Sequence, residues 1–294
     1  MTAFGVYNLE YDKKGGMNMM INGKNGSQYF LKKQVAKGET FNLHLVTDEN
    51  GTERLLSIAA TAFRNGAMDL EAFVLKSLAA KTAKRRESGS YDPKMQPLEW
   101  HFPTVIETFP FVEQDNRHVT ILGFVDLVNV GGLLALPQIR SKNFVVDLKT
   151  SVWMVGKLLK MLRFAHENGI SVGRITPNRV LLGVESERRS ETHRVILMDY
   201  THAKIHESGV VPREVARREI SDVAETMMSA ALFCDSSVDL VVAEEEKAYA
   251  EILHALRGGT YADATKAHVE FYRVARELWG SAYHPFTVKQ FTRS

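Results

Sequence analysis

The chain has 294 residues, of which 45% are hydrophobic and 24% charged, so it can bury one large core or two smaller ones and is neither disordered nor fibrous. Its 37 basic and 35 acidic residues leave a net charge of +2, which gives no general reason to expect a nucleic acid or an anionic membrane as partner. The single cysteine, Cys234, excludes an intramolecular disulfide and a cysteine-based zinc site. We expect a cytoplasmic protein, since the sequence also has no apolar signal segment and no run of about 18 apolar residues.

The first 127 residues predict a sheet with one helix. Residues 1–28 are rich in Gly, Asn and Met and are interpreted as an accessory extension containing one strand between turns. Alternating patterns then predict antiparallel strands at 29–35, 41–46, 54–63, 104–112 and 117–125. A helical stripe covers 67–82, and the polar, basic stretch 84–97 is expected to be a loop. Residues 29–127 are therefore predicted to form a five-stranded lobe that holds one helix.

The second half, residues 128–294, is predicted to be mainly helical. The strongest helical pattern is 151–169, with Asn168 and Gly169 as its C-terminal cap. Two short apolar runs, 179–184 and 194–200, predict a β-hairpin around 180–199. Further helices are expected at 219–233, 242–257 and 262–280, the second with Glu244, Glu245 and Glu246 near its favourable N-terminal end.

This order of elements, together with the segment FAHENGISVGRITPNRVLL at 164–182, resembles the eukaryotic-type protein kinases. The segment is similar to the family's catalytic loop, with Gly169, Pro177 and the run 180–182 in register. Asp199-Tyr200-Thr201 lies in the place of the D-F-G motif. The resemblance implies an α+β fold of two lobes, the second of which is abbreviated because only 294 − 222 = 72 residues follow Asp222.

Further positions follow from the resemblance. The helix at 219–233 is similar to the one whose aspartate, here Asp222, holds the catalytic-loop backbone; from its own sequence Asp222 could equally be a helix N-cap. Gly38 is the one glycine left of G-x-G-x-x-G, since Ala36 and Phe41 stand at the other two positions. The nucleotide cleft would contain Gly38, Phe41, Ala59, Glu71 and Asp199. Ala59 stands at the phosphate-pairing lysine, so Glu71, at the position that pairs with this lysine, has lost its partner.

The catalytic loop departs most from the family pattern. Val172, Gly173 and Arg174 stand at H-R-D, Thr176 stands at the loop lysine, and Arg179 stands at the metal-binding asparagine. An arginine cannot accept a proton as a general base. At most Asp199 remains as a metal ligand, and two arginines in place of an aspartate and an asparagine would oppose a divalent cation. A one-residue slip would put Asn178 at the asparagine position, but it would displace Pro177 and the following strand.

Other features suggest no different chemistry. Lys84-Arg85-Arg86 is interpreted as a solvated charge run, with a docking patch as the alternative. His166, His193 and His202 have no metal-site spacing, and His166 is expected to be a packed or capping residue. No nucleophile motif such as G-x-S-x-G occurs. Gly173 also fits the H-G-D loop of small-molecule phosphotransferases in the family, but Arg174 again replaces the aspartate.

The resemblance and its departures predict a catalytically inactive, pseudokinase-type domain that acts as a binding, regulatory or scaffold protein. We expect no cofactor, another protein as partner, and neither a nucleic acid nor a membrane. The alternative is an active but divergent ATP- and magnesium-dependent transferase of phosphoryl, nucleotidyl or another group that uses Asp199. The sequence predicts neither the identity of the partner nor the oligomeric state.

Overall fold

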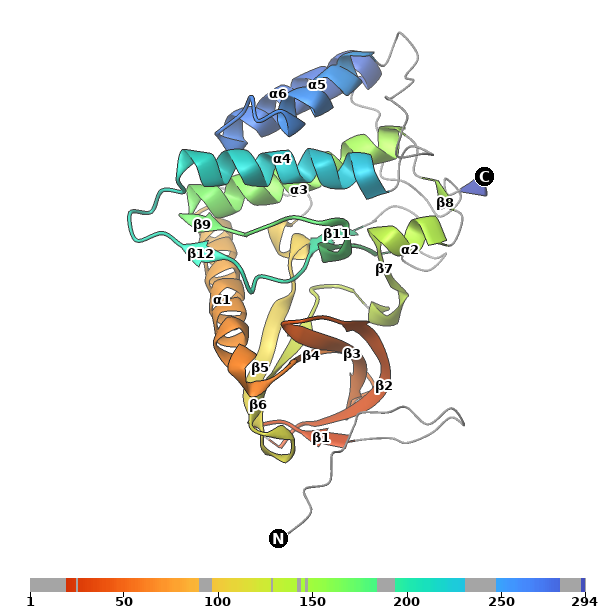
Figure 1. Ribbon diagram of the computed structural model, residues 1–294, viewed down its shortest axis with the longest axis vertical. Helices are drawn as coiled ribbons and strands as arrows, with labels where there is room; N and C mark the ends of the chain where they lie inside the picture. Colours follow the sequence, from red (N-terminus) through yellow and green to blue (C-terminus); the bar gives the residue numbers. More distant parts are fainter. Residues whose placement is uncertain are drawn as a thin grey trace.

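The computed structural model describes residues 20–24, 26–89, 97–127, 129–141, 144–145, 148–183, 194–230, 247–280 and 292–293. Figure 1 shows a curled sheet with one helix in the N-terminal half and a stack of helices in the C-terminal half. The predicted α+β architecture of two lobes is confirmed.

The N-terminal lobe is an antiparallel sheet of order β1-β2-β3-β4-β6-β5. Its strands are β1 (Met20–Asn22), β2 (Gln28–Lys37), β3 (Phe41–Asp48), β4 (Glu53–Ala59), β5 (Thr104–Phe111) and β6 (Arg117–Gly123). The five predicted strands are all present, and the strand expected within residues 1–28 pairs with β2 as a sixth.

The sheet curls until its two edges meet (Figure 1). Glu107 on β5 accepts hydrogen bonds from the Tyr29 hydroxyl, at 2.5 Å, and from the Lys24 backbone N–H, at 2.9 Å. Inside the curl lies a small apolar cluster that includes Val46 and Ile121, both with 0% exposure. The curled sheet thus has a core of its own, and its other face is free to pack on the helix and on the second lobe.

The helix of the first lobe, α1 (Asn65–Glu87), is longer than predicted. The expectation that residues 84–87 form a loop was wrong, because contacts made only in the folded chain hold the last turns. Arg86 forms an ion pair with Glu99, and the Arg85 guanidinium lies over the Phe164 ring at 5.9 Å. The three basic residues at the C-terminal end also interact favourably with the helix dipole.

The helical lobe contains α2 (Leu136–Ser141), α3 (Leu148–Glu167), α4 (Arg213–Ala230), α5 (Lys247–Arg257) and α6 (Ala264–Trp279). The predicted hairpin is β10 (Val180–Gly183) with β11 (Arg194–Leu197), and β7 (Leu133–Ala135) adds a third strand. Two short pairs complete the lobe: β9 (Ile170–Ser171) with β12 (Lys204–Ile205), and β8 (Phe144–Val145) with β13 (Thr292–Arg293). Cys234, His193 and the run 244–246 lie outside the described residues.

Helix α4 begins at Arg213, six residues before the predicted start. Asp222 therefore lies in the middle of a helix, and its interpretation as an N-cap was wrong. The charged run 213–219 hides the periodicity, but Ala216, Ile220 and Val223 are buried at helical spacing and extend the apolar stripe back to the true start.

One large apolar core connects the lobes. It runs from Leu45 on the sheet and Leu75 on α1 to Leu158 on α3 and Phe271 on α6. The two lobes are therefore packed against each other through side chains and not joined by a linker alone. Among the described residues, no helix combines the length and the apolar character needed to cross a membrane.

Candidate functional site

The candidate site is built around residues 172–179, which connect β9 to the short 3-10 turn η5 (Pro177–Arg179) and then to β10. Gly169 ends α3 with φ +68°, as its predicted capping role requires, and Gly173 has φ +83°. A Cβ atom at Gly173 would lie 3.0 Å from the backbone carbonyl oxygen of His202. The loop can therefore pass this close to the segment after β11 only with a glycine at this position.

One face of helix α4 contacts this loop. The Asp222 carboxylate accepts a hydrogen bond from the backbone N–H of Ile175 at 3.0 Å, and Thr226 donates its hydroxyl to the Ile175 carbonyl at 3.0 Å. Burial is the main cause that raises the pKa of Asp222, while the Ile175 N–H and the Arg174 guanidinium act in the opposite direction. Asp222 thus contacts the backbone of the loop.

Glu219 is a second carboxylate on the same face, and sequence reasoning did not single it out. It is fully buried and accepts hydrogen bonds from the Gly173 backbone N–H and from His166 Nε2, both at 2.7 Å. A glutamate three residues before Asp222 lies on the same side of the helix, so this spacing was the available signal. His166 is packed, as predicted, and also buttresses this carboxylate.

Arg174 and Arg179 are separated in their interactions. Arg174, at the position of the missing base, has a side chain that is 66% exposed and forms an ion pair with Asp222 at 3.0 Å. Arg179 has a side chain that is only 8% exposed and lies 3.7 Å from Asp199 Oδ2. The two arginines are therefore not one shared positive site: each interacts with a different carboxylate.

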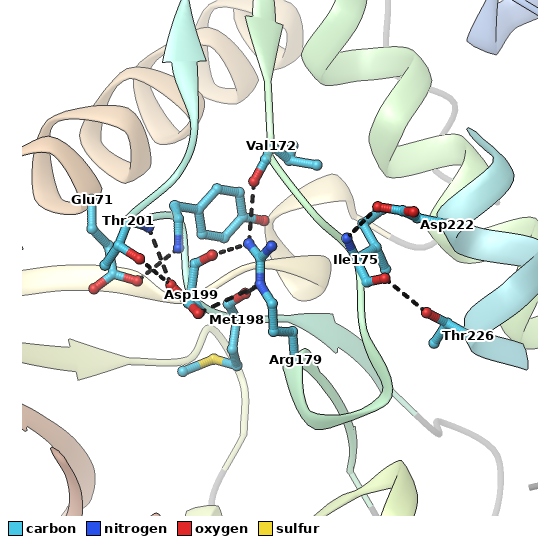
Figure 2. A network of polar contacts seen from close by, with 10 residues as sticks. Glu71, Val172, Ile175, Arg179, Met198, Asp199, Thr201, Asp222 and Thr226 are labelled. Carbon is cyan, nitrogen blue, oxygen red and sulfur yellow. Dashed lines mark hydrogen bonds and ion pairs between the residues drawn. The ribbon is translucent and has the colours of Figure 1, made fainter. Parts of the chain in front are cut away.

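Arg179 connects the loop to the strand end at Asp199 (Figure 2). Its guanidinium donates hydrogen bonds to the carbonyl oxygens of Met198 and Val172, each at 3.1 Å, and to the carbonyl oxygen of Asp199. Asn178, one residue earlier, is exposed. Of these two residues, the arginine is the one that faces Asp199, which agrees with the sequence register chosen above.

Asp199 has both carboxylate oxygens occupied by the protein itself. Its backbone has φ +64°, in the left-handed region that non-glycine residues seldom adopt. Oδ1 accepts a hydrogen bond from the Thr201 hydroxyl at 2.5 Å, and Oδ2 faces the Arg179 guanidinium (Figure 2). Thr201 stands where the family has glycine, so the same substitution that alters the motif supplies a hydrogen-bond donor to the aspartate.

Glu71 on α1 reaches the same strand end from the other lobe. Its Oε1 accepts a hydrogen bond from the Tyr200 backbone N–H at 2.9 Å, and its Oε2 has no hydrogen-bond partner among the described residues. Burial raises the pKa of Glu71 to about 7, with the charge of Asp199 acting in the same direction. Ala59 is fully buried and offers no amine, so Glu71 contacts a backbone N–H instead of a lysine.

The remaining cleft candidates lie on the sheet. Phe41 pairs with Ala59 across β3 and β4, and Phe41 and Val35 are half-buried against the main core. Gly38 lies at the exposed tip of the β2–β3 hairpin, where its N–H bonds to the Phe41 carbonyl at 3.0 Å. Thr176 is half-buried and precedes η5. The structure thus pairs Arg179 with Asp199 and bonds Glu71 to the neighbouring Tyr200 backbone, whereas Gly38 is a turn residue.

A metal would find few ligands here. Within the part of the chain that the structure describes, no three His, Cys, Asp or Glu side chains gather where they could hold a metal ion. Asp199 and Glu71 are the only carboxylates in the network of Figure 2 on the sheet side of the loop. Carboxylate oxygens are the preferred ligands of magnesium, but here one is bound to Thr201 and another faces a fixed guanidinium.

No protein-family model and no curated protein sequence matches the chain. Solved structures do. Vaccinia related kinase 3 is similar with a TM-score of 0.64 and 15% sequence identity over 93% of this chain and 94% of that one. The BubR1 kinase domain is similar with a TM-score of 0.60 and 12% identity over 93% and 87%. At this level of identity the likeness shows the fold, and the chain has the two-lobed protein kinase fold.

Proposed function

We propose that this chain is a catalytically inactive kinase-like domain that acts by binding another protein, as a regulatory or scaffold subunit. The observation that carries the proposal is the buried Arg179 guanidinium, 3.7 Å from Asp199 Oδ2. Arg179 stands at the position that would hold a metal ion together with Asp199. A cation that belongs to the protein therefore neutralises the carboxylate that a magnesium ion would need.

This arginine is also difficult to displace. It donates to three backbone carbonyls, those of Val172, Met198 and Asp199, so turning it away would leave these acceptors unsatisfied in a buried place. A divalent cation entering beside it would meet a fixed positive charge in a medium of low polarity. We infer that neither magnesium nor magnesium-bound ATP is a cofactor of this domain.

The other requirements of phosphoryl transfer are missing as well. The transfer needs a carboxylate at the acceptor hydroxyl and a cation on the phosphates. Arg174 cannot accept a proton, and its guanidinium is paired with Asp222. The buried Ala59 has no amine, and Phe41, at the position of a glycine in the family, packs half-buried against the main core. These residues support loss of catalysis and not a shifted catalytic centre.

The alternative, an active and divergent transferase, depends on Asp199. Its carboxylate side chain is 24% exposed, so a ligand could reach it, but its two oxygens already interact with Thr201 and Arg179. No observed contact favours this alternative. The net charge of +2 likewise gives no support for a nucleic acid partner, so we propose a protein partner and a cytoplasmic location.

The test is incubation of the whole chain with radiolabelled ATP, in magnesium and separately in manganese, with generic protein acceptors and with the chain itself. We expect no transfer above the level of the Asp199→Ala variant. Transfer that Asp199→Ala abolishes would contradict the proposal and favour the active alternative.

A further inference from the structure

A groove of about 570 Å³ lies in the helical lobe, away from the network of Figure 2. It forms where α3 ends, where α4 begins and where the turn between α5 and α6 approaches them; the first two lie side by side in Figure 1. Its apolar lining comes from Val211, Ala216 and Ala264, all buried, and from the half-buried Tyr261. Val210 lies at the same groove and is 66% exposed.

The carboxylates of the groove are already engaged. Asp263 caps α6 and accepts hydrogen bonds from the backbone N–H groups of Thr265, at 2.8 Å, and Lys266, at 3.1 Å. Glu167 accepts from Arg163 Nε at 2.7 Å and from the Thr265 hydroxyl at 3.3 Å. Glu167 is thus already paired with the cations Arg163 and Arg85, whereas Asp263 accepts only from neutral N–H groups and keeps its negative charge.

The cations of the groove are available. Arg213 and Lys266 are exposed, and neither forms an ion pair within the residues that the structure describes. Arg217 is paired with Glu214 at 2.8 Å, but both side chains are largely exposed, at 44% and 78%, and such pairs contribute little. The Arg217 stem lies close to Gly259, where an added Cβ atom would be 2.9 Å from Arg217 Cδ. Three cations thus surround an apolar floor.

His166 lines the groove with a side chain that is only 9% exposed. Its Nε2 bonds to Glu219, whereas its Nδ1 has no hydrogen-bond partner in the described part of the chain. This nitrogen has almost no exposed surface, so a ligand in the groove does not reach it.

We propose that this groove binds an acidic peptide segment of a partner protein. An aliphatic side chain of the segment packs on Val211, Ala216 and Ala264, and its carboxylates pair with Arg213, Arg217 and Lys266. Charge complementarity identifies the partner's chemistry, because three cations line the groove against two acids, and one of these acids, Glu167, is paired with Arg163 outside it. The volume and the apolar floor suit a peptide better than a small anion, which would leave the floor uncovered.

The inference rests on the proposed function only in that the protein acts by binding another protein. It does not depend on the state of the nucleotide cleft, because Arg213, Arg217 and Lys266 belong to a different part of the helical lobe.

The test is fluorescence anisotropy of the whole chain with two labelled probes. The first is a short peptide of glutamates interrupted by leucines, and the second has glutamine at every glutamate. The test variant is Arg213→Glu with Lys266→Glu. Both sites lie in the first turn of a helix, where an acid is favourable, so the variant should fold. The control is Lys76→Glu with Lys204→Glu, which makes the same change of charge at exposed positions elsewhere.

We expect the acidic peptide to bind more tightly than the glutamine peptide, and we expect the test variant to weaken this binding by about tenfold or more while the control changes it little. Equal effects of the two variants, equal binding of the two probes, or no binding of the acidic probe would overturn the inference. Each of these results leaves the ATP assay unaffected, and phosphate transfer in that assay would contradict the proposed function without changing this test.

Discussion

Replacing Arg179 with methionine tests whether the buried guanidinium of Arg179 is a structural cation, that is, a positive charge that stabilises the folded chain through its contacts. Methionine keeps much of the volume of the stem and removes the guanidinium. The structure gives Arg179 three hydrogen bonds to backbone carbonyls and an ion pair with Asp199. The substitution leaves three acceptors and one carboxylate without their donor in a place that is almost fully buried, so we expect a loss of about 3–5 kcal/mol in the free energy of unfolding.

The matched control is Arg174→Met, which removes the same group five residues earlier. Arg174 is 66% exposed and has one ion pair, so its loss should cost less than about 1 kcal/mol. Urea unfolding at neutral pH, followed by circular dichroism and by tryptophan fluorescence, measures both variants. If Arg179→Met and Arg174→Met lose the same stability within error, then Arg179 is not the structural cation described above, and its position would be open to a metal.

Three further predictions concern the same carboxylates and one histidine. Burial raises the pKa of Glu71 to about 7, so the contribution of the protonated carboxyl to stability is full below pH 4.5 and is lost as the pH rises through 7. Glu71→Gln should therefore stabilise the chain by about 2–3 kcal/mol at pH 8 and little at pH 4.5, and an equal gain at both pH values would contradict this. Glu219→Ala should destabilise the chain most, Asp222→Ala less and Asp199→Ala least, because the first carboxylate is fully buried between two donors; the reverse order in urea unfolding would refute the role of α4 as the support of the loop. Burial lowers the pKa of His101 to about 3, so His101 takes up a proton in the unfolded chain at a higher pH than in the folded chain, and stability present above pH 6.5 should be lost toward pH 3. The His101→Gln variant should lose less stability between pH 6.5 and pH 4.5 than the unsubstituted chain, and an unchanged pH dependence would contradict this prediction.

The strands and long helices could be predicted because their periodicity is local. The patterns of β2, β3 and α3 appear in the sequence close to the positions where the structure has them, whereas the strand predicted at 54–63 was too long: β4 ends at Ala59 and Ala62–Arg64 forms a 3-10 turn. The extra turns of α1 and the early start of α4 could not, since both are fixed by tertiary contacts such as the pair of Arg86 with Glu99. Charged residues dominate both segments, and propensity alone does not distinguish a charged helix turn from a loop.

The hydrogen bonds and ion pairs of the candidate site could not be predicted from the sequence. The resemblance located Glu71, Asp199 and Arg179, and the structure brings them together. The sequence could not indicate that Arg179 is buried while Arg174 is exposed, because Arg174 lies in a loop and Arg179 in a three-residue 3-10 turn, and neither has a periodicity that marks a buried face. Glu219 was missed for a related reason: its place on the face of α4 became visible only with the true start of the helix.

The central claim, that a protein cation replaces the metal at Asp199, is tested most directly by isothermal titration of the whole chain with ATP, with and without magnesium. We predict no binding that depends on magnesium, in the unsubstituted chain or in Asp199→Ala, because Arg179 neutralises the carboxylate and Thr201 bonds to it. Tight ATP binding that requires magnesium and is lost in Asp199→Ala would contradict the account.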